Sequence, residues 1–149
     1  YSTFIGTDKP DSTRQMRYFH NFYGIFNVTG KFGIIAGFDI GSEQKTKGSS
    51  NINTWYAPVL ILKYAINGKW TLATRGEYYY DRNEVIIVSG TSNGFQTSGF
   101  SFNLDYAPVK NVLIRLETRT LKSKDNIFAK RNGYVDNNTF ITSSLAVNF

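Results

Sequence analysis

The sequence predicts an all-β protein, an antiparallel up-and-down transmembrane β-barrel with about eight strands in this chain, and three observations support this prediction. Long runs alternate apolar and polar residues with a period of two, which is the periodicity of a β-strand. Short and long links alternate between these runs. Aromatic residues concentrate near the ends of the runs, as they do where strands meet the surfaces of a membrane. The 149 residues are enough for one domain, so residues 1–149 are treated as a single β-barrel domain.

The predicted strands follow from their side-chain patterns along the chain. They cover residues 1–5, 16–28, 32–41, 55–66, 70–82, 100–106, 112–119 and 139–149. The first strand is short, and the loop after it contains the breaker residues Gly6 and Pro10. The second strand has aromatic residues on its even positions, and its odd positions are less polar than those of the later strands. The third strand sets bulky apolar residues mainly against small residues and Asp39.

The fourth and fifth strands form the clearest predicted hairpin. Asn67 and Gly68 join them, and Asn-Gly is the strongest short-range hairpin signal. Pro58 is a defect in the fourth strand, because proline cannot donate a hydrogen bond to the ladder, and it predicts a rim position or a β-bulge. In the fifth strand the charged residues fall only on odd positions until Arg82.

The sixth and seventh strands repeat this segregation on either side of a link at residues 107–111. Between the fifth and sixth strands, residues 82–94 are irregular but contain an apolar patch at 85–88, which we expect to extend a strand above the membrane. Residues 126–138 predict the last long loop. The final strand alternates apolar residues with small or polar ones as far as Phe149.

The lengths of the links match those of an outer-membrane barrel. The short links are residues 29–31, 67–69 and 107–111, and polar loops separate the remaining strands. Outer-membrane barrels have short turns on one side and longer loops on the other. A strand of about 11 residues at about 3.3 Å each is about 36 Å long, and a tilt near 45° leaves about 25 Å, the height of the apolar band.

The orientation of the two faces separates a membrane barrel from a soluble protein. In a soluble ligand-binding barrel or sandwich the apolar face forms the core. In a membrane barrel the apolar face contacts lipid and the polar face lines a lumen, and the long runs, alternating links and aromatic ends favour this second arrangement. The charged residues that we then expect to line the pore are Lys63, Arg75, Glu77, Asp81, Asp105, Arg115, Glu117 and Arg119.

These charged side chains support two roles. Opposite charges on neighbouring strands brace the inner wall through cross-strand pairs. In a wide lumen the same side chains bias the passage of ions, as rings of charge do in channels. Because the two signs still nearly balance when Asp39 is added, the sequence predicts no preference for anions or cations.

Aromatic residues predict both boundaries of the membrane. Trp70 and Tyr106 lie beside short links, whereas Tyr18, Trp55 and Tyr80 lie near long loops. Tyrosine and tryptophan prefer such boundaries because one part of the ring system is apolar and another part is hydrated.

Composition and motifs exclude several other classes of protein. The basic residues behind the net charge of +6 are dispersed, so no nucleic-acid partner is predicted. No run approaches the roughly 18 to 20 apolar residues of a membrane-spanning helix. His20 is the only histidine, so neither a histidine metal site nor a catalytic triad can be assembled. Arginines near Glu77 and Glu117 favour ion pairing over acid–base catalysis. We predict no catalytic residue, no metal and no cofactor.

Three stretches resemble a known family. They are WTLATRGEYYYDRNEVIIVSG at residues 70–90, FSFNLDYAPVKNVLIRLETRTLKSKDNIF at residues 100–128, and TFITSSLAVNF at residues 139–149. The Arg-Gly-Glu-Tyr and Arg-Leu-Glu-Thr-Arg pieces are the most specific. These stretches resemble the OmpL-like β-barrel porin family of bacterial outer membranes, and the resemblance covers most of the chain from about Tyr18 onwards.

The resemblance implies a non-enzymatic porin of the bacterial outer membrane that lets ions and small polar solutes diffuse passively. Members of this family are commonly much longer, which implies that this chain is the C-terminal part of a larger barrel, as the short first strand also suggests. The implied partners are outer-membrane lipid, the diffusing solutes and the barrel-assembly machinery, because a terminal aromatic such as Phe149 resembles the signature that this machinery reads.

Two alternatives stay open at this point. Eight strands alone enclose an interior just filled by side chains. The first alternative is therefore a pore-free structural barrel, or an accessory subunit that works with other envelope proteins in a larger outer-membrane complex. The second is the soluble ligand-binding barrel or sandwich.

Overall fold

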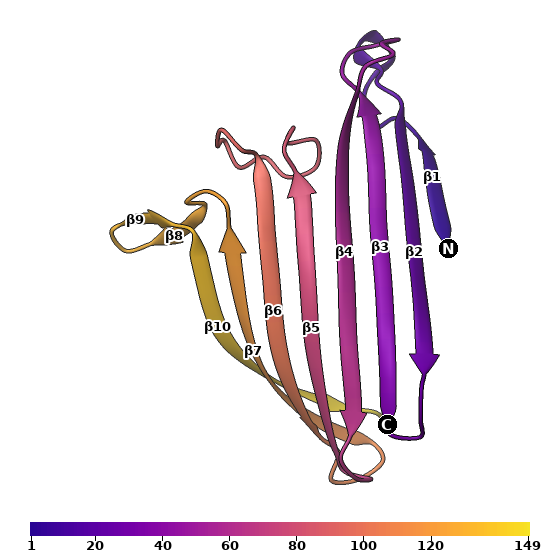
Figure 1. Ribbon diagram of the computed structural model, residues 1–149, viewed down its shortest axis with the longest axis vertical. Helices are drawn as coiled ribbons and strands as arrows, with labels where there is room; N and C mark the ends of the chain where they lie inside the picture. Colours follow the sequence, from indigo (N-terminus) through magenta and orange to yellow (C-terminus); the bar gives the residue numbers. More distant parts are fainter.

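The computed structural model describes residues 1–149 and shows one large curved antiparallel sheet (Figure 1). Its strands are β1 (Ser2–Gly6), β2 (Arg17–Asn27), β3 (Phe32–Gln44), β4 (Ile52–Ala65), β5 (Trp70–Asp81), β6 (Phe95–Tyr106), β7 (Val112–Ser123) and β10 (Asn137–Val147). A short 3₁₀ helix, η1 (Asp11–Thr13), lies between β1 and β2. The small strands β8 (Phe128–Lys130) and β9 (Gly133–Val135) form a separate hairpin.

The strands are arranged up and down in chain order. Each pairs with its sequence neighbours, and β10 follows β7 once the β8–β9 hairpin is set aside. The predicted all-β, antiparallel up-and-down arrangement with about eight strands is therefore confirmed. β1 and β10 form the two edges and are not hydrogen-bonded to each other, so the sheet is not closed.

Short turns and long loops lie at opposite ends of the sheet. Figure 1 shows the long connections at the top and the three short ones at the bottom. In the turn after β4, the side-chain oxygen of Asn67 accepts hydrogen bonds from the backbone N–H groups of Lys69 (2.9 Å) and Trp70 (3.1 Å). This local bonding is the reason that asparagine favours such turns.

The strand register sorts the side chains onto two faces. We call inner face the one that carries the odd-numbered residues of β2 to β7 and the even-numbered residues of β1 and β10, and outer face the opposite one. On β6 the inner-face residues Ser101 and Asn103 are buried, whereas Phe100 on the outer face is 60% exposed. Leu116 on the outer face of β7 is 51% exposed. No second layer covers the outer face, in contrast to a soluble sandwich.

Pro58 is neither at a rim nor in a bulge, and that prediction is wrong. It lies in the middle of β4. Towards β5, the pairs Tyr56–Tyr80 and Val59–Glu77 keep the same register, and no ladder pair forms between them. Proline lacks the N–H that such a pair needs. The strand therefore loses local pairing without inserting an extra residue.

Some predicted boundaries move in the structure. β6 begins at Phe95, five residues earlier than expected, because Gln96 and Ser98 pair with β5 although they lack apolar alternation. Residues 85–88 do not extend a strand and belong to an irregular loop. The predicted last loop contains the β8–β9 hairpin.

Candidate functional site: the inner face of the sheet

The register gathers the charged residues named from the sequence on the inner face. Lys63, Arg75, Glu77, Asp81, Asp105, Arg115, Glu117 and Arg119 all occupy inner-face positions. Lys63 lies on β4, and the other seven lie on β5, β6 and β7. That these residues line a pore stays a prediction, but the placement on one face that it requires is present.

The central feature of this face is an ion-pair cluster that spans β6. Arg75 on β5 and Arg119 on β7 each donate from Nη2 to the carboxylate of Glu77 on β5. We call this group the Arg75–Glu77–Arg119 bridge. It differs from the expected pairing of neighbouring strands, because β5 and β7 are separated by β6. The side chains of Glu77 and Arg119 therefore meet across one whole strand.

Small residues on β6 make room for this crossing. Gly99 lies opposite Glu77, and Ser101 lies opposite both Arg75 and Arg119. A Cβ atom on Gly99 would lie 2.5 Å from Oε1 and 2.8 Å from Cγ of Glu77. These distances are shorter than any normal contact. The absence of a side chain at position 99 thus lets Glu77 reach over β6.

A second pair does follow the expected cross-strand pattern. Arg115 on β7 donates two hydrogen bonds of 2.7 Å, from Nε and Nη2, to the two carboxylate oxygens of Asp105 on β6. Such bidentate pairs fix the geometry of both side chains. Lys63 and Glu117 take part in no ion pair.

A further cluster lies at the end of the inner face nearest the long loops. Arg17 on β2 donates from Nε to Glu43 on β3 (2.8 Å) and from Nη1 to Asp8 (2.5 Å). Lys9 adds a bond of 3.1 Å to the other oxygen of Glu43. None of these residues is among those predicted from the sequence to line the pore. Glu43 lies outside the predicted third strand, which ends at residue 41, whereas β3 continues to Gln44 and places Glu43 opposite Arg17.

Trp55 belongs to this cluster and does not mark a membrane boundary, so that interpretation is wrong. Its side chain lies on the inner face, is only 3% exposed and packs on Gly41, where a Cβ atom would lie 2.0 Å from the ring. The guanidinium carbon of Arg17 lies 5.8 Å from the ring centroid, a cation–π contact. By contrast, Trp70 and Tyr106 stack on the outer face at 4.4 Å between ring centroids, beside the short turns as expected.

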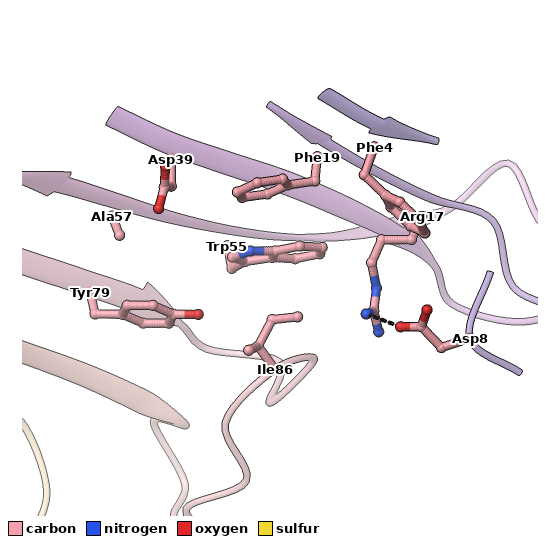
Figure 2. A pocket seen from close by; sticks show the side chains of 9 residues that line it. All are labelled: Phe4, Asp8, Arg17, Phe19, Asp39, Trp55, Ala57, Tyr79 and Ile86. Carbon is pink, nitrogen blue, oxygen red and sulfur yellow. Dashed lines mark hydrogen bonds and ion pairs between the residues drawn. The ribbon is translucent and has the colours of Figure 1, made fainter. Parts of the chain in front are cut away.

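Two adjoining cavities open on the inner face. The first, of about 440 Å³, is lined by Phe4, Asp8, Arg17, Phe19, Asp39, Trp55, Ala57, Tyr79 and Ile86 (Figure 2). The second, of about 380 Å³, shares Asp39, Ala57 and Tyr79 with the first and reaches the Arg75–Glu77–Arg119 bridge. Ile87 lines the second cavity. Together they form a polar hollow with aromatic and aliphatic walls.

Asp81 has no solvent exposure, which corrects its predicted place among the pore-lining residues. It is completely buried at the end of β5. Its carboxylate accepts hydrogen bonds from the backbone N–H groups of Val85 (2.9 Å), Ile86 (2.7 Å) and Ile87 (3.0 Å). The sequence pattern gave the correct face for Asp81, but these loop contacts remove it from the solvent.

The inner face presents charges of both signs in nearly equal number. Without Asp81, the four cations Lys63, Arg75, Arg115 and Arg119 face the three carboxylates of Glu77, Asp105 and Glu117. Asp39, which accepts a hydrogen bond of 2.5 Å from Asn21, balances the remaining charge. No three histidine or acidic side chains lie close enough to hold a metal ion. The arrangement can therefore orient and screen charged solutes.

Comparison with known proteins agrees with this geometry. The structure contains no helix with the length and apolar character needed to cross a membrane. Searches of curated proteins and of solved structures each gave no significant match. One family model, described as "Putative beta-barrel porin-2, OmpL-like", matches residues 1–149, the whole chain. The chain therefore belongs to the OmpL-like β-barrel porin family.

Proposed function

We propose that this chain forms part of the wall of a channel in the bacterial outer membrane, through which ions and small polar solutes diffuse passively. The observation that carries the proposal is the opposite chemistry of the two faces. The Arg75–Glu77–Arg119 bridge and the Arg115–Asp105 pair lie on the inner face. Large apolar side chains such as Phe100 and Leu116 are exposed on the outer face.

Lipid is the partner that the outer face requires under this proposal. Exposed aliphatic and aromatic side chains follow this face from β2 to β10 with no protein layer over them. In water such a surface is an aggregation hazard, whereas in a bilayer it is the normal outside of a barrel. Membership of a porin family supports the outer membrane as the location.

A passive channel also explains why the inner face holds paired charges. The carboxylates of Glu77 and Asp105 are both paired with arginine. Ionised, paired groups of this kind set the local field and do not shuttle protons. We therefore propose a transport role without enzymatic activity, which agrees with the porin family.

The test is electrical and uses the protein purified at its native length from the outer membrane. Insertion into a planar lipid bilayer should give discrete, ohmic conductance steps. Liposomes that contain the protein should also swell when a small sugar is supplied outside. If the protein inserts without conductance and without sugar uptake, the channel proposal is wrong and a pore-free structural or accessory role takes its place.

A further inference from the structure

The loop that joins β5 to β6, residues 82–94, has more internal hydrogen bonds than a simple connection needs. It contains no strand or helix, yet two carboxylates organise it. Asp81, at its start, accepts three backbone N–H groups and has no cationic partner. A fully buried carboxylate is costly unless it is well hydrogen-bonded. The three N–H donors from residues 85–87 meet this need, and they force the backbone to turn around Asp81.

Glu84 organises the next turn of the loop. Its Oε1 atom accepts hydrogen bonds from Ser89 N (3.0 Å), Ser89 Oγ (2.6 Å) and Gly90 N (2.7 Å). The hydrogen bond from the Ser89 hydroxyl is the main reason that the pKa of Glu84 is lowered. Gly94 closes the loop with φ +61°, and a Cβ atom there would lie 2.3 Å from the carbonyl oxygen of Arg82. The loop is therefore held at both of its ends.

The following long loop holds residues 82–94 from the side. Asn93 donates from its backbone N (3.1 Å) and from Nδ2 (2.9 Å) to the carboxylate of Asp125. The hydrogen bond from the Asn93 side chain is the main cause of the lowered pKa of Asp125. Two neighbouring long loops are thus joined at a fixed point.

These restraints turn two apolar residues of the loop toward the inner face. Ile86 lines the first cavity, and Figure 2 shows it beside Trp55 and Tyr79. Ile87 lines the second cavity, which also includes Arg75 and Arg119. The next residue, Val88, lines neither cavity and is 79% exposed.

We propose that residues 82–94 form a constriction over the inner face, in which Ile86 and Ile87 limit the size of passing solutes and Asp81 is the positioning residue. This inference rests on the channel function proposed above. A solute moving along this face passes the aliphatic side chains of the loop on one side and the Arg75–Glu77–Arg119 bridge on the other. The geometry favours small polar solutes and excludes bulky ones at this level.

Paired size changes at Ile87 test the constriction. Ile87→Ala should raise single-channel conductance and admit larger uncharged sugars into liposomes, whereas Ile87→Trp should lower both. Val88→Ala and Val88→Trp are the matched controls, because Val88 lies in the same loop but away from the cavities. They should leave conductance at the wild-type value. Equal responses at positions 87 and 88, or no response at 87, would overturn the constriction.

Loss of the loop anchor provides the second measurement. Asp81→Asn exchanges one carboxylate oxygen for a donor that faces backbone N–H groups, so the loop should leave the inner face and the size limit should rise. Asp11→Asn is the control, since it makes the same substitution at an exposed carboxylate in η1 that forms no ion pair. If Asp81→Asn keeps the wild-type limit, the positioning role is wrong while the channel stands. A wild-type protein without conductance overturns both proposals.

Discussion

Glu77 on β5 and Arg119 on β7 form an ion pair across β6, although their strands are not neighbours. The residues are 42 positions apart in the chain. The pair exists because Gly99 has no side chain at the point of crossing. A glycine on the intervening strand therefore leaves the space in which these two side chains meet.

The first prediction concerns Gly99. Gly99→Ala should displace the Glu77 side chain and lower the free energy of unfolding by about 1–3 kcal/mol, the usual range for overpacking. The measurement is denaturant unfolding in lipid or detergent. Gly76→Ala is the control in the neighbouring strand, because a Cβ atom there meets nothing within 4 Å. Equal losses for the two variants would contradict the proposed role of the crossing.

The second prediction concerns the contact between Gly41 and Trp55. Gly41→Ala should expel the Trp55 ring from its buried position, because the new Cβ atom would overlap the ring. In a Trp70→Phe background Trp55 is the only tryptophan, so its fluorescence should shift to longer wavelength. Gly33→Ala, in the same strand with its nearest neighbouring atom at 3.6 Å, should leave the emission unchanged. An unchanged spectrum in the Gly41 variant would show that the ring packs elsewhere.

The third prediction tests the orientation of the two faces. Leu116→Arg places a charge on the outer face in the middle of β7 and should destabilise a protein embedded in lipid by about 2–4 kcal/mol. Thr142→Arg places the same charge on the inner face, opposite Glu117, and should change stability by less than about 0.5 kcal/mol. Refolding titrations into lipid vesicles give both values. If Thr142→Arg destabilised the protein more than Leu116→Arg, the inner face and not the outer face would contact lipid, and the proposed orientation would be wrong.

The fourth prediction concerns pH and residues 82–94. The pKa of Glu84 lies below its ordinary value of 4.5, because the Ser89 hydroxyl and nearby backbone N–H groups bind the ionised form. Its contribution to the order of the loop is therefore complete above pH 4.5 and is lost as the pH falls through the lower native pKa. Single-channel conductance should therefore stay constant from neutral pH down to about pH 4.5 and rise as the pH falls further, through the native pKa of Glu84.

Glu84→Gln provides the control for this pH effect. Glutamine stays neutral across the whole range, so the variant should show a raised conductance at neutral pH and a smaller change on acidification. Asp125 continues to titrate in this variant, with a pKa also lowered from its ordinary value, so part of the acid response should remain. If the variant has the same pH profile as the wild type, protonation of Glu84 does not open the loop.

The sequence by itself determined the strands and the two faces. Side chains alternate along a strand whatever its neighbours are, so period-two patterns placed Arg75, Arg115 and Leu116 on their correct sides. The short turns were equally local, because Asn67 bonds to residues two and three positions ahead. These features depend on contacts that are close along the chain.

Only the tertiary structure decided how these side chains are used. Alternation puts Asp81 on the inner face, but the N–H groups that bury it come from a loop without any periodic pattern. Likewise, nothing in a single strand indicates that Glu77 reaches Arg119 over Gly99, or that Trp55 packs on Gly41. Such contacts join residues that the strand register brings together from distant parts of the chain, and their energy depends on the space that each partner leaves.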